Sequence, residues 1–529
     1  MRTLVWLALA LLVGAPLAAL AAMGLRPEAL SVFADPAVGQ AAVNSVASAA
    51  GSAVLATAAG AVLAVVLERS NVPGRAALRW VVLLPFLIPP FIGAMAWMAL
   101  LGVNGPVNKA LAALGVAEPV SIFGGWGVVF LLAVHSYPMA YLVIAAALRR
   151  IPGNLEEAAR ISGASTPRVL ATVTGPLLRP GLLAAFVLTL VANLSDFGIP
   201  ALIGLPERYT TLTTLVYRYL ASGTTTNPLP AVSAIGLVLL ALALLAVLAQ
   251  RRLPADTQLA AGTTALPLDL GPARFPVALM LWAAAAAVCV VPLLALASQA
   301  LLPAPGVPLT WDNLTLDNIV RAATSRGAVA GTATSLMLAG IAAAACAVLG
   351  LGVGLLLTRA RHRSNAALDV AATLPQALPG LVIAAGWLLI APALGIFNTP
   401  WVILGAYVMA FLALVVQSVR APLASVSDAL EEAARTSGAT PLRALVDVTA
   451  RLAAPAAATG AVVVFLTAVR ELTISILLVA PGTQTLGVTI FNLQQAGDYN
   501  AASALALLVA LVGVAGLSAT AALTARRAS

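Results

Sequence analysis

Charged residues are scarce in this 529-residue chain: Asp, Glu, Lys and Arg together make up 9%, against about 25% in an ordinary soluble domain. Such a chain cannot cover a water-exposed surface, because 61% of its residues are hydrophobic and its mean hydropathy is +1.02. It must bury apolar side chains against lipid, where only helices and closed barrels satisfy the backbone. The apolar runs are long and continuous rather than alternating, so the sequence predicts an all-α polytopic membrane protein.

Lysine, histidine and cysteine are also rare, and each shortage excludes a class of site. Lys109 is the only lysine and lies in no G-x-x-x-x-G-K-[ST] loop, so the chain cannot bind ATP phosphates in that way. His135 and His362 are the only histidines, and no cluster of His, Asp and Glu resembles an enzyme active site. Cys289 and Cys346 lie in apolar runs and are expected to be inert. The sequence therefore predicts no catalytic residue, no metal site and no cofactor.

Apolar runs of about 20 residues are long enough to cross a membrane as helices. Twelve such runs can be identified, six in each half of the chain. The predicted spans are 4–25, 44–67, 80–102, 122–148, 181–204, 229–250, 276–300, 328–357, 370–392, 401–419, 456–480 and 500–524.

The positive charges indicate how these spans are oriented, because cytoplasmic loops carry an excess of Lys and Arg. With the N-terminus inside, 21 of the 28 basic residues lie on the cytoplasmic side, six lie outside, and Arg470 falls within a span. Both termini are therefore predicted to be cytoplasmic. The first span could instead be a cleaved signal peptide, because Arg2 precedes an apolar core. Its counterpart at 276–300 favours retention.

A ten-residue segment occurs twice, as LEEAARISGA at 155–164 and LEEAARTSGA at 430–439. The offset of 275 residues continues without a gap to Pro180 and Pro455. A second match, at an offset of 290, relates residues 84–97 to 374–387, which share Leu-Pro, a further Pro and a Trp. These repeats predict two homologous six-helix halves in the same orientation, with a pore or binding site at their interface.

The halves are predicted at 1–250 and 276–529, joined by a polar cytoplasmic linker at 251–275. The repeated segment lies between the fourth and fifth spans of each half. Its Glu, Ala and Arg residues favour a helix, and Gly163 is suited to end it. A solvated amphipathic connector would have the same pattern, but the recurrence of the segment indicates that both copies meet similar partners.

The repeated segment resembles the E-A-A-x-x-x-G loop of binding-protein-dependent ABC import permeases, and the resemblance extends over nearly the whole chain. In that family the loop forms a coupling helix that docks into a groove on a cytoplasmic ATPase. The resemblance implies the following coupling residues: Glu157, Ala158, Ala159 and Gly163 in the first half, and Glu432, Ala433, Ala434 and Gly438 in the second.

The distal part of the family pattern is incomplete in both halves. Gly175 stands before Pro176 where the family has an apolar residue, and Ala450-Arg451 replace both the apolar residue and the proline in the second half. The second return segment is therefore expected to differ in geometry from the first.

The resemblance also implies the function and the partners of the chain. It implies a transport subunit of the bacterial inner membrane rather than an enzyme, with ATP hydrolysis on a separate chain. The implied partners are two cytoplasmic ATP-binding subunits, a periplasmic substrate-binding protein and membrane lipid, with no nucleic acid. Asp-Phe-Gly-x-Pro at 196–200 and Arg-Glu-Leu at 470–472 look like the fused iron(III)-type permeases. Similar two-half chains import thiamine, polyamines or phosphonates, so these substrates stay open.

Charged side chains within spans cost roughly 2.5–3.5 kcal/mol at the bilayer centre and need a reason. Asn193, Asp196, Arg470 and Glu471 are the candidates for a pathway or gate, and the paired acidic positions would favour a cation. The alternative is a structural role, with both carboxylates hydrogen-bonded between helices or to Arg470. His135 is expected to be a satisfied interior histidine rather than a metal ligand.

Two other classes of protein share part of this sequence pattern. A secondary transporter with six plus six spans also has twelve helices in parallel halves, but it does not need the duplicated loop. A membrane-embedded enzyme needs clustered catalytic groups, which this sequence lacks.

Overall fold

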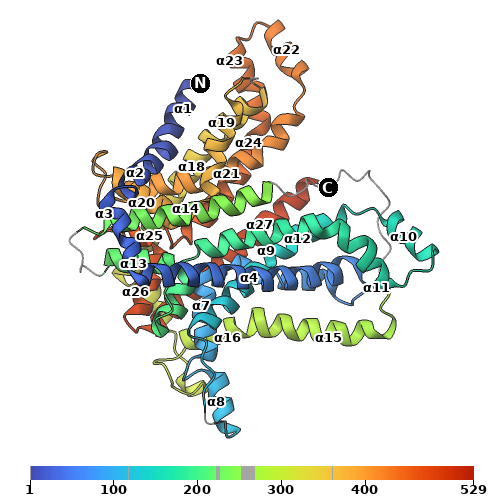
Figure 1. Ribbon diagram of the computed structural model, residues 1–529, viewed down its shortest axis with the longest axis vertical. Helices are drawn as coiled ribbons and strands as arrows, with labels where there is room; N and C mark the ends of the chain where they lie inside the picture. Colours follow the sequence, from blue (N-terminus) through green and yellow to red (C-terminus); the bar gives the residue numbers. More distant parts are fainter. Residues whose placement is uncertain (1, 117, 222–226, 252–267, 360–361, 529) are drawn as a thin grey trace.

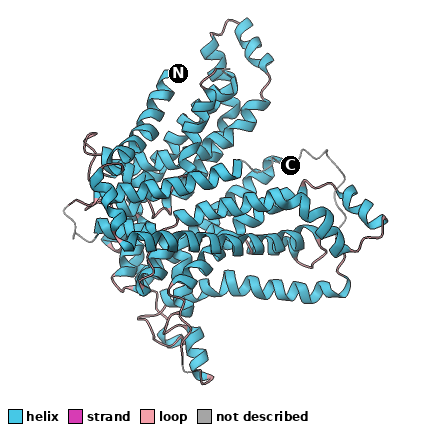
Figure 2. Cartoon of the chain, in the orientation of Figure 1, coloured by secondary structure: helices cyan, strands magenta, loops and turns pink. Residues whose placement is uncertain are grey.

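The computed structural model describes residues 2–528 except 117, 222–226, 252–267 and 360–361. Helices dominate these ranges (Figure 2), and the described residues form no β-strand beyond one isolated bridge between Ser70 and Leu268. The all-α fold predicted from the long apolar runs is therefore confirmed.

Helices α1 to α14 make up the first half. Short 3-10 and π-helical turns join several of them. Their bounds are α1 Arg2–Leu9, α2 Ala15–Gly24, α3 Pro27–Leu30, α4 Pro36–Arg69, α5 Arg75–Val81, α6 Leu84–Leu87, α7 Pro90–Leu101, α8 Pro106–Ala113, α9 Gly125–Arg149, α10 Gly153–Ile161, α11 Thr166–Val169, α12 Gly175–Ser195, α13 Leu212–Ala221 and α14 Leu229–Arg251.

Helices α15 to α27 make up the second half, where the long helices α18, α21 and α24 correspond to α4, α9 and α12. Their bounds are α15 Arg274–Ala285, α16 Val291–Ala300, α17 Asp317–Thr324, α18 Arg326–Arg359, α19 Asn365–Thr373, α20 Gly380–Ile390, α21 Pro400–Ser425, α22 Asp428–Thr436, α23 Pro441–Ala444, α24 Arg451–Val469, α25 Ser475–Leu478, α26 Leu486–Gln495 and α27 Tyr499–Ala528.

Ten helical segments of the described chain are long and apolar enough to cross a membrane, and the bent segment 365–390 would be an eleventh. Helix α27 lies at the twelfth predicted span, and its part 499–513 is a shorter apolar helix. Several spans are broken where the sequence reading made them continuous. Pro85 and Pro89 divide 80–102 into α5, α6 and α7, and the equivalent prolines bend 365–390 by 110°.

Each half has a core of three long helices that cross at equivalent glycines. In the first half α4 and α12 pack on α9, and in the second α18 and α24 pack on α21. A Cβ on Gly60 of α4 would lie 2.9 Å from the Cβ of Ala140. A Cβ on Gly350 of α18, at the offset of 290, would lie 2.8 Å from the Cβ of Val415. Small residues at these crossings let the helix backbones approach closely, as is common inside membranes.

The first span of each half packs against the opposite half. Helix α2 lies against α20, where a Cβ on Gly386 would come within 2.8 Å of the carbonyl oxygen of Pro16. In return, α16 packs on α7, and the Tyr137 hydroxyl lies 3.4 Å from the sulfur of Cys289. These reciprocal contacts fasten the two halves together along their sides.

Beyond this shared region the core helices of the two halves diverge (Figure 1). Helices α4, α9 and α12 form one arm that leads to α10, and α18, α21 and α24 form another arm that leads to α22. The arms meet at their other ends, around α2, α14, α20 and α25. Helices α10 and α22 therefore stand at the tips of separate arms.

The end of the predicted linker is hydrogen-bonded to the first half. Linker residues 252–267 lie outside the described part of the chain. The backbone N–H of Asn71 donates to the carbonyl of Leu268 at 3.3 Å, and the Asn71 side chain accepts from the N–H of Leu270 at 3.1 Å. Hydrogen bonds from the Gly271 amide and the Asn71 side chain hold the pKa of Asp269 below its usual value. Helix α15 begins at Arg274, within the stretch predicted as linker.

Candidate functional site

Helix α10 is a short, exposed element between α9 and the helix that returns to the membrane region. It ends at Ile161, where Gly163 takes a left-handed conformation with φ of +85°. The N–H of Ala164 donates to the carbonyl of Ala159 at 3.0 Å, which closes the helix end. Ile161 is 88% exposed and Leu155 is 39% exposed, so the helix presents apolar side chains with no cover.

Helix α22 has the same construction at the offset of 275. Gly438 has φ of +92°, and the N–H of Ala439 donates to the carbonyl of Ala434 at 3.0 Å. Leu430 is 48% exposed. The two predicted coupling segments therefore form helices with matching ends, and each exposes a leucine near its start.

The adjacent glutamates of each repeat differ sharply in their surroundings. Glu157 is half-buried and Glu432 is exposed, so both reach the surface of their helices. Glu156 is only 5% exposed and bonds within its own half, as does Glu431. The resemblance implies a coupling role for Glu157 and Glu432, and these are the outward glutamates of the two pairs, while Glu156 and Glu431 are the inward ones.

Both return segments contain a π-helical turn, Leu170–Thr174 before α12 and Leu445–Ala450 before α24. The missing proline of the second half was expected to change this segment. It does not alter the secondary structure, because a π turn needs no proline and the Arg451 backbone continues the helix.

The predicted pathway carboxylates lie at equivalent breaks in α12 and α24. Helix α12 ends at Ser195, and the next residue, Asp196, accepts a hydrogen bond at 2.9 Å from the N–H of Ile199 through Oδ1. Glu471 follows the end of α24 and accepts three hydrogen bonds: from the N–H of Ile474 at 2.6 Å, and from the N–H and hydroxyl of Ser475 at 3.1 and 2.8 Å. Each carboxylate caps the turn that follows its break.

The same two carboxylates line a cavity of about 230 Å³ between the halves. His135 and Arg470 also line it, so four ionisable groups from both halves face one space. Arg470 Nη1 donates to the carbonyl of Leu87 at 2.6 Å, across the interface. Among the described residues no ion pair joins Arg470 to either carboxylate, so the bond to Arg470 considered from the sequence is absent there.

Asn193 lies apart from this cavity. Its amide nitrogen donates to the hydroxyls of Ser52 at 2.8 Å and Ser136 at 3.2 Å, which ties α12 to α4 and α9. It lines a very small cavity beside Asp196. The structure thus brings together Asp196, Arg470 and Glu471 but leaves Asn193 in a helix junction.

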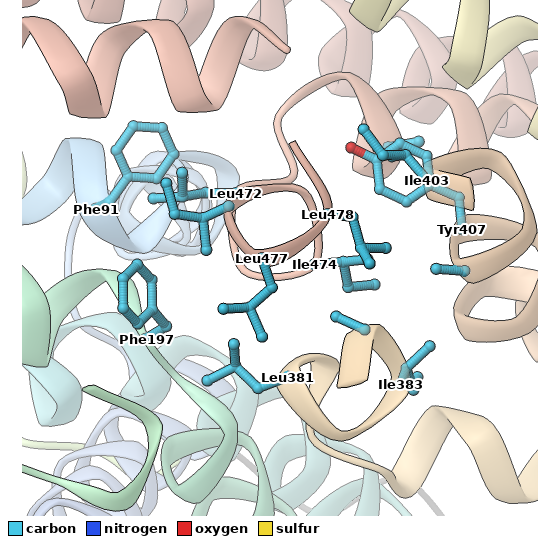
Figure 3. Close-up of a cluster of buried hydrophobic side chains, with 14 of the residues drawn as sticks. Phe91, Phe197, Leu381, Ile383, Ile403, Tyr407, Leu472, Ile474, Leu477 and Leu478 are labelled. Carbon is cyan, nitrogen blue, oxygen red and sulfur yellow. The ribbon is translucent and has the colours of Figure 1, made fainter. Parts of the chain in front are cut away.

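A plug of large apolar side chains adjoins the cavity (Figure 3). Its central members are two repeat pairs, Phe91 with Leu381 and Phe197 with Leu472, and all four are at most 4% exposed. The ring of Phe197 lies 5.7 Å from that of Phe491, which belongs to the other half. The plug therefore closes the interface with side chains from both halves.

Sequence reasoning missed the plug and two arginines. Arg69 and Arg359 were read only as inside charges, yet each ends a long core helix and contacts the inward glutamate of its half. Their common offset of 290 was a usable signal, because the nearby Leu-Pro match has the same offset. The plug residues differ in type between halves, so the sequence held no such signal for them.

Two related helical halves, each with a matched exposed helix and a share of a central plugged cavity, define a two-half membrane transport protein. A model of the family described as binding-protein-dependent transport system inner membrane component matches residues 56–258 and 347–529, more than half of the chain. The chain belongs to this family and is a multi-pass inner membrane permease.

Curated relatives match both halves or one of them. The probable ABC transporter permease protein y4fN of Sinorhizobium fredii is 28% identical over 469 residues, covering 84% of this chain and 80% of the relative. The Fe(3+)-transport system permease protein FbpB 2 of Haemophilus influenzae is 24% identical over 453 residues, covering 85% and 83%. The molybdenum transport system permease protein ModB of Haemophilus influenzae is 35% identical over 137 residues, covering 26% and 58%.

Proposed function

We propose that this permease imports iron(III) delivered by a periplasmic binding protein, driven by two cytoplasmic ATP-binding subunits that dock on α10 and α22. The observation that carries the coupling role is the duplication itself. Two helices with the same capped end and uncovered apolar side chains stand at the tips of separate arms. A pair of identical partners fits such a pair of sites.

The coupling residues we assign are those of the motif. Glu157 and Glu432 reach the surface beside Ala158, Ala159, Ala433 and Ala434, whose small side chains permit close approach of a groove. Gly163 and Gly438 end the helices. We assign ATP hydrolysis to the partner subunits.

The translocation pathway we propose runs between the halves through the charged cavity and the apolar plug. Asp196 and Glu471 line it, with Arg470 and His135 beside them. Carboxylate oxygens suit hard cations, which supports a metal cation as substrate. The arms are apart at the coupling helices (Figure 1), and the side chains of the plug are buried, as expected for a resting state open to the cytoplasm.

The proposed orientation has both termini and both coupling helices in the cytoplasm. The arginine distribution supports it. The side chain of Arg2 donates to Ser364 and Asn365, so the N-terminal helix lies at the coupling end of the arm that leads to α22. Retention of the first span stays a prediction, and N-terminal sequencing of the membrane-extracted protein tests it.

The test of the function is purification of the tagged chain in mild detergent, followed by reconstitution. We expect an ATP-binding subunit to co-purify and to be lost when Glu157 and Glu432 are both replaced by Ala. In vesicles, ATP should drive uptake of radioactive iron(III) presented by a co-purified binding protein. ATP-independent uptake by the chain alone would contradict the importer and favour a secondary transporter.

The substrate is tested separately, by competition. The similarity to the Fe(3+)-transport permease over most of the chain supports iron(III), although y4fN, whose name gives no substrate, is also similar over most of it. Uptake unaffected by excess iron(III) but inhibited by thiamine, a polyamine or a phosphonate would leave the importer intact and reassign its substrate.

A further inference from the structure

The inward glutamate of the first coupling helix lies at a junction of three elements. Arg69, the last residue of α4, donates through Nη2 to the carbonyls of Leu148 at 2.8 Å and Ile151 at 3.2 Å, where α9 ends. The same nitrogen lies 3.7 Å from Glu156 Oε1. The arginine therefore connects the end of α4, the end of α9 and the coupling helix.

The return segment joins the same junction. The Thr174 hydroxyl donates to Glu156 Oε1 at 2.9 Å, and Thr174 is the last residue before α12. Glu156 and Thr174 are both at most 5% exposed. Arg69, Glu156 and Thr174, here named the anchor, thus tie α10 to all three core helices of its arm.

The second half contains a complete second anchor. Arg359, the last residue of α18, donates through Nη2 to the carbonyls of Leu423, at 3.0 Å, and Val426, and its Nε lies 3.6 Å from Glu431 Oε1. The Thr449 hydroxyl donates to Glu431. The arginines differ by 290 residues, and the other equivalent pairs differ by 275.

The anchor is the same in both halves, whereas positions at the cavity and the plug differ between them. Between the halves the cavity changes Asp196 to Glu471, and the plug changes Phe197 to Leu472. All three anchor side chains are identical in both copies, together with the backbone carbonyls that they hold. A shared structural task of the two arms explains this better than a role in substrate choice.

We propose that the two anchors are positioning sites that transmit movement of the coupling helices to the core helices, and that they do not contact the ATPase. The inference rests on the proposed docking of an ATPase on α10 and α22. Glu156 is buried beneath the surface that carries Glu157, so a docked partner cannot reach it. A displacement of α10 instead pulls on α4, α9 and α12 together, through the ion pair of Arg69 with Glu156 and the hydrogen bonds that these two residues make to the end of α9 and to Thr174.

The two anchors differ in how far their side chains are exposed, so equivalent substitutions in them should have unequal effects. The side chains of Arg69 and Glu156 are 8% and 6% exposed, whereas those of Arg359 and Glu431 are 12% and 23% exposed. Arg359 also pairs with the exposed Asp428. Removal of one partner from a buried ion pair leaves an uncompensated charge. Glu156→Gln should therefore have a larger effect than Glu431→Gln.

The experiment uses the whole transporter with its ATPase in lipid nanodiscs. Spin labels are attached at Glu207→Cys and Gln484→Cys, two exposed positions at the end opposite the coupling helices, and Cys289 and Cys346 are buried. We expect Glu156→Gln to keep the ATPase bound and hydrolysing ATP. The ATP-dependent shift in label distances should be largely lost.

A matched control is Asp447→Asn on the second return segment. Its exposed carboxylate accepts from Arg443 of the same segment, so the same chemical change there should leave the shift intact. A shift of wild-type size in Glu156→Gln would overturn the proposal. So would loss of the ATPase from that variant, because Glu156 would then serve docking.

A second variant tests the proposal if Glu156→Gln does not fold. Thr174→Val preserves the shape and both charges of the anchor but removes the hydroxyl donor, and it should reduce the shift in the same direction. A shift of wild-type size in that variant would also overturn the proposal. Failure of the wild-type chain to retain any ATPase is a different result, because it would refute the proposed function itself.

Discussion

Replacing Asp196 by Asn separates the two roles that its carboxylate can serve. The side chain caps the turn after α12 with one hydrogen bond, from Ile199, and it also faces the central cavity. Asn caps helices about as well as Asp, because its carbonyl oxygen accepts the same bond. The substitution therefore removes the charge and preserves the cap.

The size of the expected effect follows from this geometry. A cation about 4 Å from a carboxylate gains about 4 kcal/mol at an effective dielectric constant of 20. Even half of that gain is worth more than tenfold in binding, because each 1.4 kcal/mol or so is a factor of ten. We expect ATP-driven uptake by Asp196→Asn to fall at least about tenfold, with thermal stability in detergent unchanged.

Asp196→Ala is the control, since it removes both the charge and the cap. It should lose uptake and about 1 kcal/mol of stability as well. The pathway role is refuted if Asp196→Asn takes up substrate at the wild-type rate while Asp196→Ala loses both uptake and stability. The carboxylate would then be a cap alone.

Further predictions concern the second carboxylate, the plug, the helix crossings and the coupling surface. Glu471→Gln should destabilise the fold by about 1–3 kcal/mol in thermal unfolding, because an amide cannot accept at both ends and one of its three donors is left unpaired; a fully stable variant would contradict this. Phe197→Ala should cost about 3–5 kcal/mol and let ions leak through vesicles without ATP, whereas tight vesicles would argue against the plug. Gly350→Leu should prevent α18 from packing on α21 and lower the yield of folded protein, while Gly340→Leu on the same helix, where a Cβ meets nothing within 4 Å, should be harmless; equal yields would contradict the crossing. Ile161→Glu should weaken co-purification of the ATPase, since burial of such a side chain is worth about 1.5–3 kcal/mol, and undiminished recovery would place the docking surface elsewhere.

The sequence was informative where a physical signal repeats along the chain. Apolar runs of helical length predicted the spans, and the duplicated LEEAAR segment predicted α10 and α22 with the glycine that ends each helix. These are local features, because helix propensity and hydropathy act over a few turns.

The sequence was less informative where packing decides the structure. The breaks at Pro85 and at Asp196 divide apolar runs that look continuous, and the path after each break depends on contacts with the other half. Likewise, the reciprocal packing of α2 on α20 and of α16 on α7 joins segments hundreds of residues apart. Neither hydropathy nor spacing encodes which partner such a helix chooses.

The two halves keep the same residue at two kinds of place inside each arm and differ at the cavity and plug that they share. The core crossings retain Gly60 and Gly350, and the ends of the arms retain Arg69 and Arg359 with their carbonyl partners. Each of these features serves a single half, so a change in one copy cannot be compensated by the other. The cavity and plug are shared, so a smaller residue from one half can be offset by a larger one from its partner, as with Leu472 opposite Phe197. Fusion of the halves makes this possible, because each half then always meets the same complementary partner.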